Sequence, residues 1–236
     1  GECAIVPMNI DFIILAAGRG TRMGGDTPKV LASLAGKPMI QHLIDTVDSF
    51  PSSKTSIVVG YKSNEVERDL VSQKKLSFVK QKNQLGTAHA VKQALPNIRK
   101  NSVAVILYGD VPLVKKNTLN RLIKSASTGK LSLLTFIKDD PKGYGRIIRG
   151  SRKNVQKITE HKDASSAEKE IREVNSGILA IKASLLQQFI SKIKNNNAAK
   201  EYYLTDLVEI SNNHSVDVVA TLCDPYEVGG ANDKKE

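Results

Sequence analysis

The sequence predicts one α/β domain in which helices flank a mostly parallel β-sheet. Two patterns support this fold class. Apolar runs rich in β-branched residues alternate with segments of helical periodicity, and polar or glycine-containing stretches separate them. A chain of 236 residues is also long enough to bury a substantial core. We expect the domain to occupy residues 9–236 and interpret residues 1–8 as a tag or a disordered N-terminal segment.

The expected strands are short runs of apolar residues bounded by polar ones, as in strands covered on both faces. In chain order they occupy residues 10–16, 56–59, 76–80, 103–108, 131–137, 174–181 and 216–222. In sheets of this class, ligands bind beyond the carboxyl ends of the strands. The loops that follow the strands are therefore where chemistry is expected.

The segments between the strands carry apolar residues at intervals of three and four, as one face of a helix does. Pro38 suits the first turn of the first such segment. The pattern predicts helices over 39–47, 65–71, 87–95, 118–126, 185–193 and 203–210. Residues 138–163 interrupt the alternation with proline and glycine. We expect a small β insertion there, with a hairpin formed by 146–149 and 154–158.

The composition is that of a basic globular chain. Lys and Arg number 35 against 24 Asp and Glu, and the net charge of +11 would attract nucleic acid, an anionic membrane or phosphorylated substrates. The lysines are spread along the chain, so a purely solubilising role is an equal alternative. Aromatic residues make up 5% and are dispersed, which disfavours a module that stacks nucleic-acid bases.

Cysteine usage and hydropathy predict a cytoplasmic protein. Cys3 and Cys223 lie near opposite ends without CxxC spacing, which indicates neither a disulfide framework nor a zinc site. No apolar run approaches the ~20 residues of a membrane span, so we expect no membrane partner. The histidines show no metal-ligand spacing, and we expect core or surface roles for them: His42, His89, His161 and His214.

The strongest chemical signal directly follows the first expected strand. The sequence there reads Leu15-Ala16-Ala17-Gly18-Arg19-Gly20-Thr21-Arg22-Met23, and Pro28-Lys29-Val30-Leu31 comes shortly after. A glycine-rich turn exposes backbone N–H groups to phosphate oxygens, and glycine has no Cβ to keep a phosphate away. Arg22 and Lys29 add positive charge to the same loop, so we expect them to be catalytic. Neither the Walker loop nor GxGxxG is matched.

A carboxylate, Asp110, follows the buried strand 103–108, with Gly109 before it and Pro112 after it. Such a residue fits a helix cap or a turn. Opposite a polyphosphate it would instead be the hard oxygen ligand that Mg²⁺ requires. The residues alone leave both readings open.

Together these segments resemble the sugar-1-phosphate nucleotidyltransferases, in which a consensus LxxGxGxRxx…PK grips a nucleoside triphosphate. The resemblance narrows to the uridylyltransferase domains of the bacterial N-acetylglucosamine-1-phosphate uridylyltransferases and covers residues 12–232. It implies a Rossmann-like, mixed but mostly parallel sheet of the nucleotide-diphospho-sugar transferase fold. Further segments in family order carry it: Gln84-Leu85-Gly86-Thr87-Ala88-His89-Ala90, Leu107-Tyr108-Gly109-Asp110-Val111-Pro112-Leu113, Gly143-Tyr144-Gly145-Arg146-Ile147, Glu160-His161-Lys162-Asp163-Ala164, Glu173-Val174-Asn175-Ser176-Gly177 and Glu201-Tyr202-Tyr203-Leu204-Thr205-Asp206.

The resemblance assigns roles to the residues of these motifs. Gln81 and Gly86 would recognise uracil. The full set of nucleotide-binding residues would be Leu15, Ala16, Ala17, Gly18, Gly20, Thr21, Gln81, Gly86 and Thr87. The substrate-binding residues would be Tyr108, Gly109, Gly145, Glu160, Asn175 and Thr205. Glu160 beside Lys162 also fits a surface ion pair. Asp110 and Asn232 would bind Mg²⁺, although Gly229 replaces the acidic residue usual in the pattern around Asn232.

The implied reaction joins UTP to N-acetylglucosamine 1-phosphate, releases pyrophosphate and yields UDP-N-acetylglucosamine for peptidoglycan and lipopolysaccharide synthesis. The attacking phosphate oxygen is already anionic, so no general base is needed. Full-length members of the family continue into a β-helix acetyltransferase domain with hexapeptide repeats, and this sequence has no such repeats. We therefore expect no use of acetyl-CoA and favour a monomer.

Three alternatives remain open from the sequence. The first is a related nucleotidyltransferase with another sugar or base, such as one that makes dTDP-glucose, CDP-polyol or UDP-muramic-acid derivatives. The second is a basic nucleic-acid-binding module, against which the dispersed aromatic residues argue. The third is a catalytically silent relative, which the presence of Arg22, Lys29 and Asp110 disfavours.

Overall fold

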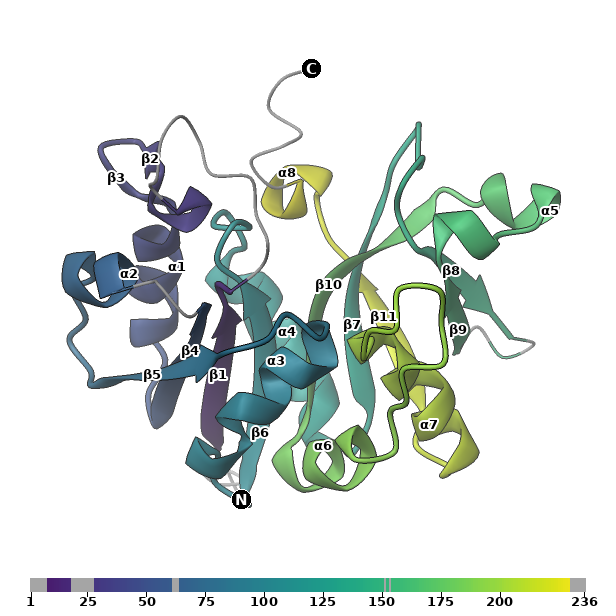
Figure 1. The fold of residues 1–236 in the computed structure, drawn as a ribbon. Helices are drawn as coiled ribbons and strands as arrows, with labels where there is room; N and C mark the ends of the chain where they lie inside the picture. Colours follow the sequence, from purple (N-terminus) through teal and green to yellow (C-terminus); the bar gives the residue numbers. More distant parts are fainter. Residues whose placement is uncertain (1–7, 18–27, 61–63, 151, 153, 230–236) are drawn as a thin grey trace, which may run out of the picture.

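A nine-stranded mixed sheet forms the centre of the molecule in the computed structural model, which describes residues 8–17, 28–60, 64–150, 152 and 154–229. Seven strands follow one another in the order β11-β7-β10-β6-β1-β4-β5, and β8 and β9 extend the sheet beside β10 (Figure 1). The strands are β1 (Asn9–Leu15), β4 (Ser53–Gly60), β5 (Leu76–Gln81), β6 (Ser102–Tyr108), β7 (Leu131–Ile137), β8 (Arg146–Arg149), β9 (Val155–Thr159), β10 (Glu173–Lys182) and β11 (Val218–Leu222).

The sheet is mostly parallel, as the sequence predicts. β1 lies between β4 and β6 and is parallel to both, and the pairs β4–β5 and β7–β11 are parallel too. β10 runs antiparallel to β6 and to β7, and the pairs β8–β10 and β8–β9 are antiparallel as well. The start of β10 therefore lies at the same edge as the end of β6, and the sheet brings both to the expected ligand side.

Helices cover both faces of the sheet and produce two cores (Figure 1). Along β6, Val103, Val105 and Leu107 pack in the core under α1 and α4, while Ala104 and Ile106 pack in the core under α3, α6 and α7. This alternation follows from the two-residue period of a strand. The α-helices are α1 (Met39–Asp48), α2 (Asn64–Asp69), α3 (Thr87–Ala94), α4 (Lys116–Ser127), α5 (Ser166–Lys169), α6 (Ala183–Ile190), α7 (Leu207–Asn213) and α8 (Pro225–Val228).

Each expected strand and long helix is present, with shifts at the ends. Helix α2 ends at Asp69, two residues before the expected end. The reason is a tertiary contact: the Gln41 side chain accepts from Val71 N at 3.0 Å and donates to Val71 O at 2.7 Å, so this backbone bonds to α1 instead of continuing a helix. The expected helix 203–210 starts with a 3₁₀ turn and becomes α-helical only at Leu207.

The short elements are absent from the sequence prediction. These are β2 (Ser33–Leu34), β3 (Lys37–Pro38), α5, α8 and the 3₁₀ turns η1 (Lys29–Leu31), η2 (Leu95–Asn97), η3 (His161–Asp163) and η4 (Leu204–Asp206). They are too short for periodicity to show. Helix α5 did carry a local signal, a capping box in which Ser165 and Glu168 bond to each other's backbone N–H. Among the described residues, no helix has the length and apolarity to cross a membrane.

Candidate active site

The predicted nucleotide-binding residues that the structure describes gather at one edge of the sheet. Leu15 and Gln81 end β1 and β5, and Tyr108, which was predicted to bind the substrate, ends β6 at the same edge. The loop after β1 is held to both neighbours, because Ala16 N donates to Val58 O at 2.8 Å and Gly109 N donates to Leu15 O at 3.0 Å. This is the edge at which the sequence predicts ligand binding.

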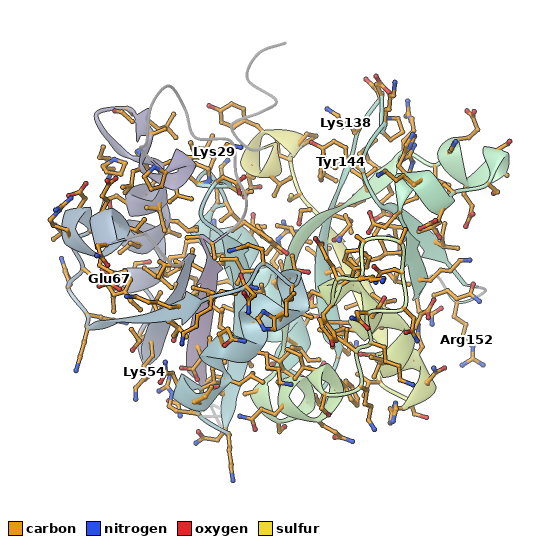
Figure 2. All side chains as sticks on the ribbon, in the orientation of Figure 1. Lys29, Lys54, Glu67, Lys138, Tyr144 and Arg152 are labelled. Carbon is orange, nitrogen blue, oxygen red and sulfur yellow. The ribbon has the colours of Figure 1, made fainter. Side chains whose placement is uncertain are left out.

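Lys29 and Asp110 meet at this edge. Lys29 Nζ lies 3.4 Å from Asp110 Oδ2, and the two side chains are 10% and 41% exposed. Figure 2 shows Lys29 beyond the ends of the central strands. Gly109 makes the approach possible, because a Cβ there would lie 2.9 Å from Val30 Cγ1. The glycine between strand and carboxylate thus lets η1 bring Lys29 to Asp110.

Asp110 offers the chemistry that a magnesium ion needs. Its carboxylate is an exposed hard oxygen ligand at a phosphate-binding edge, and Mg²⁺ is commonly held by one or two carboxylates together with substrate phosphates. In the described part of the chain no three His, Cys, Asp or Glu residues form a metal-binding group. The residues present therefore fit a metal ion shared with the substrate.

Several predicted site residues lie outside the part of the chain that the structure describes. They are Gly18, Gly20, Thr21, Arg22 and Asn232. Their roles in phosphate binding, catalysis and metal binding stay predictions from the sequence.

Gln81 is held in a network at the end of β5. The residue is 2% exposed, and its amide Nε2 lies 2.9 Å from His89 Nδ1 and 3.3 Å from Gly86 O. Burial, followed by the positive charge of Lys92, lowers the pKa of His89. A histidine with a depressed pKa stays neutral near physiological pH and can accept a hydrogen bond.

Gly86 permits the close approach of another segment of the chain. The φ angle of Gly86 is +110°, and a Cβ there would lie within 3.0 Å of three backbone atoms of Tyr202. The 201–205 loop is bonded to this turn, since Tyr202 N donates to Leu85 O at 2.8 Å and Leu204 N donates to Thr87 Oγ1 at 3.0 Å. Uracil recognition by Gly86 and Thr87 remains a prediction.

The predicted sugar-binding residues form a second cluster. Asn175 N donates to Gly145 O at 2.9 Å, and a Cβ on Gly145 would lie 3.3 Å from Glu160 Oε1. Glu160 forms no ion pair with Lys162 among the described residues. Burial, then the charges of Asp163 and Asp206, raise the pKa of Glu160. Thr205 precedes Asp206 at the start of α7, and its predicted role near the sugar phosphate stays a prediction.

Tyr108 joins the two clusters. A Cβ on Gly177 would lie 2.8 Å from Tyr108 Cε2, so the ring packs over the glycine where β10 begins. Burial, and then Asp110, raise the pKa of Tyr108 well above its ordinary value. The hydroxyl is therefore a neutral donor or acceptor between the Lys29–Asp110 pair and the Asn175 region.

Sequence reasoning missed three residues that shape the site. Gly177 has φ of +91° and was quoted only as part of a motif. Arg146 is 1% exposed and donates to Tyr144 O and Lys169 O, which ties the sugar-side loop to α5. Glu227, 5% exposed, accepts from Lys115 N and Thr118 Oγ1 at the start of α4. A polar residue in an apolar setting was the available signal for Arg146, and its partner Lys169 lies 23 positions away in the sequence.

A doubly wound sheet with a lysine–carboxylate pair beyond the ends of its strands is typical of nucleotide-binding proteins. The chain belongs to the MobA-like NTP transferase domain family, whose model matches residues 12–174. It is therefore a nucleotidyltransferase.

Curated relatives match nearly the whole chain. It is 47% identical over 231 residues to Bifunctional protein GlmU of Pseudomonas syringae pv. syringae, covering 97% of this chain and 50% of that protein. A protein of the same name from Alcanivorax borkumensis is 43% identical over 228 residues, covering 96% of this chain and 50% of that protein. The chain thus spans about half the length of these relatives.

Solved structures confirm the fold. A UDP-glucose pyrophosphorylase complexed with UDP-glucose matches with a TM-score of 0.74 at 16% identity, covering 97% of this chain and all, 100%, of that one. HddC from Yersinia pseudotuberculosis, complexed with GMP-PN, matches with a TM-score of 0.65 at 20% identity, covering 96% and 99%. At these identities the likeness concerns the fold alone.

Proposed function

We propose that this domain transfers a uridylyl group from UTP to N-acetylglucosamine 1-phosphate. The observation that carries the proposal is the contact of Tyr108 with Gly177, which joins the Lys29–Asp110 pair to the cluster around Asn175. A triphosphate at the first cluster and a sugar at the second would place their phosphates side by side. The match with proteins named GlmU over nearly the whole chain supports the choice of substrates.

In the proposed reaction a phosphate oxygen of the sugar 1-phosphate attacks the α-phosphorus of UTP. The bond from that phosphorus to the bridging oxygen of the β-phosphate breaks, and pyrophosphate leaves with the bonding electrons. Because the nucleophile is already an anion, this chain has to position and neutralise charge and needs no base.

The roles of the residues follow from their charges. The Lys29 ammonium is suited to bind phosphate oxygens, and Arg22 is proposed to do the same. Asp110, with Asn232 as the proposed second ligand, would hold Mg²⁺, which would act as a Lewis acid and reduce the charge of the phosphates. The Gln81 amide is assigned to the base, and Glu160, Asn175 and Gly145 are assigned to the sugar.

Glu160 suits hydroxyl groups of a sugar because an ionised carboxylate accepts hydrogen bonds from them. Its partly desolvated setting strengthens each such bond. The product would be UDP-N-acetylglucosamine, a precursor for peptidoglycan and lipopolysaccharide. Since UTP is a cytoplasmic metabolite, we place the reaction in the cytoplasm.

The test is pyrophosphate release, measured with and without Mg²⁺, over a matrix of substrates. UTP, CTP and dTTP are each combined with N-acetylglucosamine 1-phosphate, glucosamine 1-phosphate and glucose 1-phosphate. The proposal expects magnesium-dependent release that is fastest with UTP and the N-acetylated sugar. If pyrophosphate release is fastest with another pair of substrates, that pair replaces UTP and N-acetylglucosamine 1-phosphate in the proposal. If no pair gives pyrophosphate release, the proposed activity is wrong.

A further inference from the structure

His89 lies between two glutamine side chains on α3 and at the end of β5. Its Nδ1 lies 2.9 Å from Gln81 Nε2, and its Nε2 lies 3.3 Å from Gln93 Nε2. Gln93 also donates to the His89 backbone carbonyl at 3.0 Å. The imidazole therefore contacts the side-chain amide of Gln81, the residue that we assign to the base. His89 itself belongs to one of the sequence motifs but has no role assigned to it.

The contacts of Gln81 determine which way its amide points. The carbonyl oxygen of Gly86 can only accept, so the Gln81 atom 3.3 Å from it is the NH₂ nitrogen. The same nitrogen faces His89 Nδ1, and we assign the neutral tautomer in which Nδ1 accepts from Gln81 and Nε2 carries the ring proton. Both amide hydrogens are thereby used. Within the described residues Oε1 has no hydrogen-bond partner, although the side chain is only 2% exposed.

Oε1 is the polar atom of the Gln81 side chain that these contacts leave for a ligand. Gln81 pairs in register with Gly60, and a Cβ on Gly60 would lie 3.8 Å from Ala17 O in the loop after β1. The free acceptor thus belongs to the wall beside the predicted nucleotide loop.

An acceptor at this place distinguishes two pyrimidines. Uracil presents an N3–H donor, whereas cytosine presents an unprotonated N3 acceptor at the same ring position. Oε1 would bond to uracil and repel cytosine, while a reversed amide would favour cytosine. The choice of base then depends on what holds the amide in its orientation.

We propose that His89 is a specificity-determining positioning residue, which accepts from Gln81 Nε2 and thereby keeps Oε1 turned toward the base to select UTP over CTP. This inference rests on the proposed uridylyl transfer. It adds that the choice of UTP over CTP depends on His89, a residue that contacts the Gln81 amide and not the base itself. The neutral ring suits this role, because a protonated imidazole would present an N–H to the NH₂ group.

The test compares two replacements of His89 by calorimetric binding of UTP and of CTP and by kcat/KM for both. His89→Leu removes the acceptor. His89→Asn places an amide oxygen near the position of Nδ1 and serves as the rescue. We expect His89→Leu to lower the ratio of kcat/KM for UTP to kcat/KM for CTP at least about tenfold. This is the size expected for one mispaired buried polar group. We expect His89→Asn to keep the ratio within about threefold of wild type.

Two further variants make the result decisive. Gln93→Ala removes a contact of His89 that does not involve Gln81, and we expect an unchanged ratio. His89→Phe keeps a ring without an acceptor and replaces His89→Leu if the latter does not fold. Equal losses on UTP and CTP with His89→Leu or His89→Phe would show a merely structural role and overturn the inference. Because nucleotide binding needs no sugar, a wild type that binds UTP but makes no product contradicts only the proposed reaction.

Discussion

Lys29 Nζ lies 3.4 Å from Asp110 Oδ2, across 81 positions of sequence. The ammonium is largely buried, so its contact with the carboxylate balances a charge that would be costly to leave alone. A polyphosphate with bound Mg²⁺ is complementary in charge to both side chains. The metal cation would bind the Asp110 carboxylate, and the phosphate oxygens would bind the Lys29 ammonium. This complementarity supports the proposal that the pair binds the metal and the phosphates.

Replacing Lys29 by Ala is expected to lower kcat about 10²–10³-fold, because it removes a fixed cation from a site where negative charge shifts between phosphates. Steady-state pyrophosphate release measures the effect. Lys54→Ala is the matched control, because Lys54 is an exposed lysine on β4. A Lys29→Ala enzyme with near-normal turnover would remove Lys29 from catalysis.

Asp110→Asn is expected to impair the dependence of the reaction on Mg²⁺ while it changes the stability of the fold only a little. The amide keeps the size of the carboxylate and loses the charge that Mg²⁺ prefers, so the rate should need more Mg²⁺ for half-saturation and fall at least about 10²-fold. The measurement is a Mg²⁺ titration of the rate, with the exposed Asp69→Asn as control. An unchanged titration curve would show that Asp110 acts in the ion pair only.

The order of the elements along the chain, and the edge of the sheet at which the predicted site residues lie, were predictable because they depend on local patterns. The run from Leu15 to Ala17 ends a periodic strand, and Asp110 follows another, so parallel pairing alone brings their loops together. The contacts of Gly86 with Tyr202 and of His89 with Gln81 were not predictable in this way. Each depends on how a loop or helix packs against a strand end, and no spacing in the sequence encodes that packing.

Gly86→Ala should destabilise the domain more than Gly129→Ala does. Both glycines have positive φ, +110° and +95°, which costs an L-residue about 1–2 kcal/mol. A Cβ at Gly86 also meets the Tyr202 backbone, whereas one at Gly129 meets nothing within 4 Å. Urea unfolding of both variants measures the difference. Equal losses of unfolding free energy would mean that the Tyr202 loop moves aside without cost.

The raised pKa of Glu160 predicts how sugar binding depends on pH. Burial, then Asp163 and Asp206, favour the neutral form, so on acidification Glu160 takes up its proton at a higher pH than an exposed glutamate would. The proton removes the acceptor that we assign to the sugar hydroxyls, and KM for the sugar phosphate should rise as the pH falls through that range. In Glu160→Gln the KM should be about tenfold higher than in the wild type at neutral pH and should lack this rise on acidification.

The control for this pH profile is Glu170→Gln, an exposed glutamate beyond α5. The sugar phosphate itself titrates, but it does so equally for every variant, so the ratio of KM between Glu160→Gln and wild type isolates the protein group. That ratio should shrink toward one on acidification, because the wild type then also presents a neutral side chain. A ratio that stays constant with pH would show that Glu160 does not titrate while it contacts the sugar.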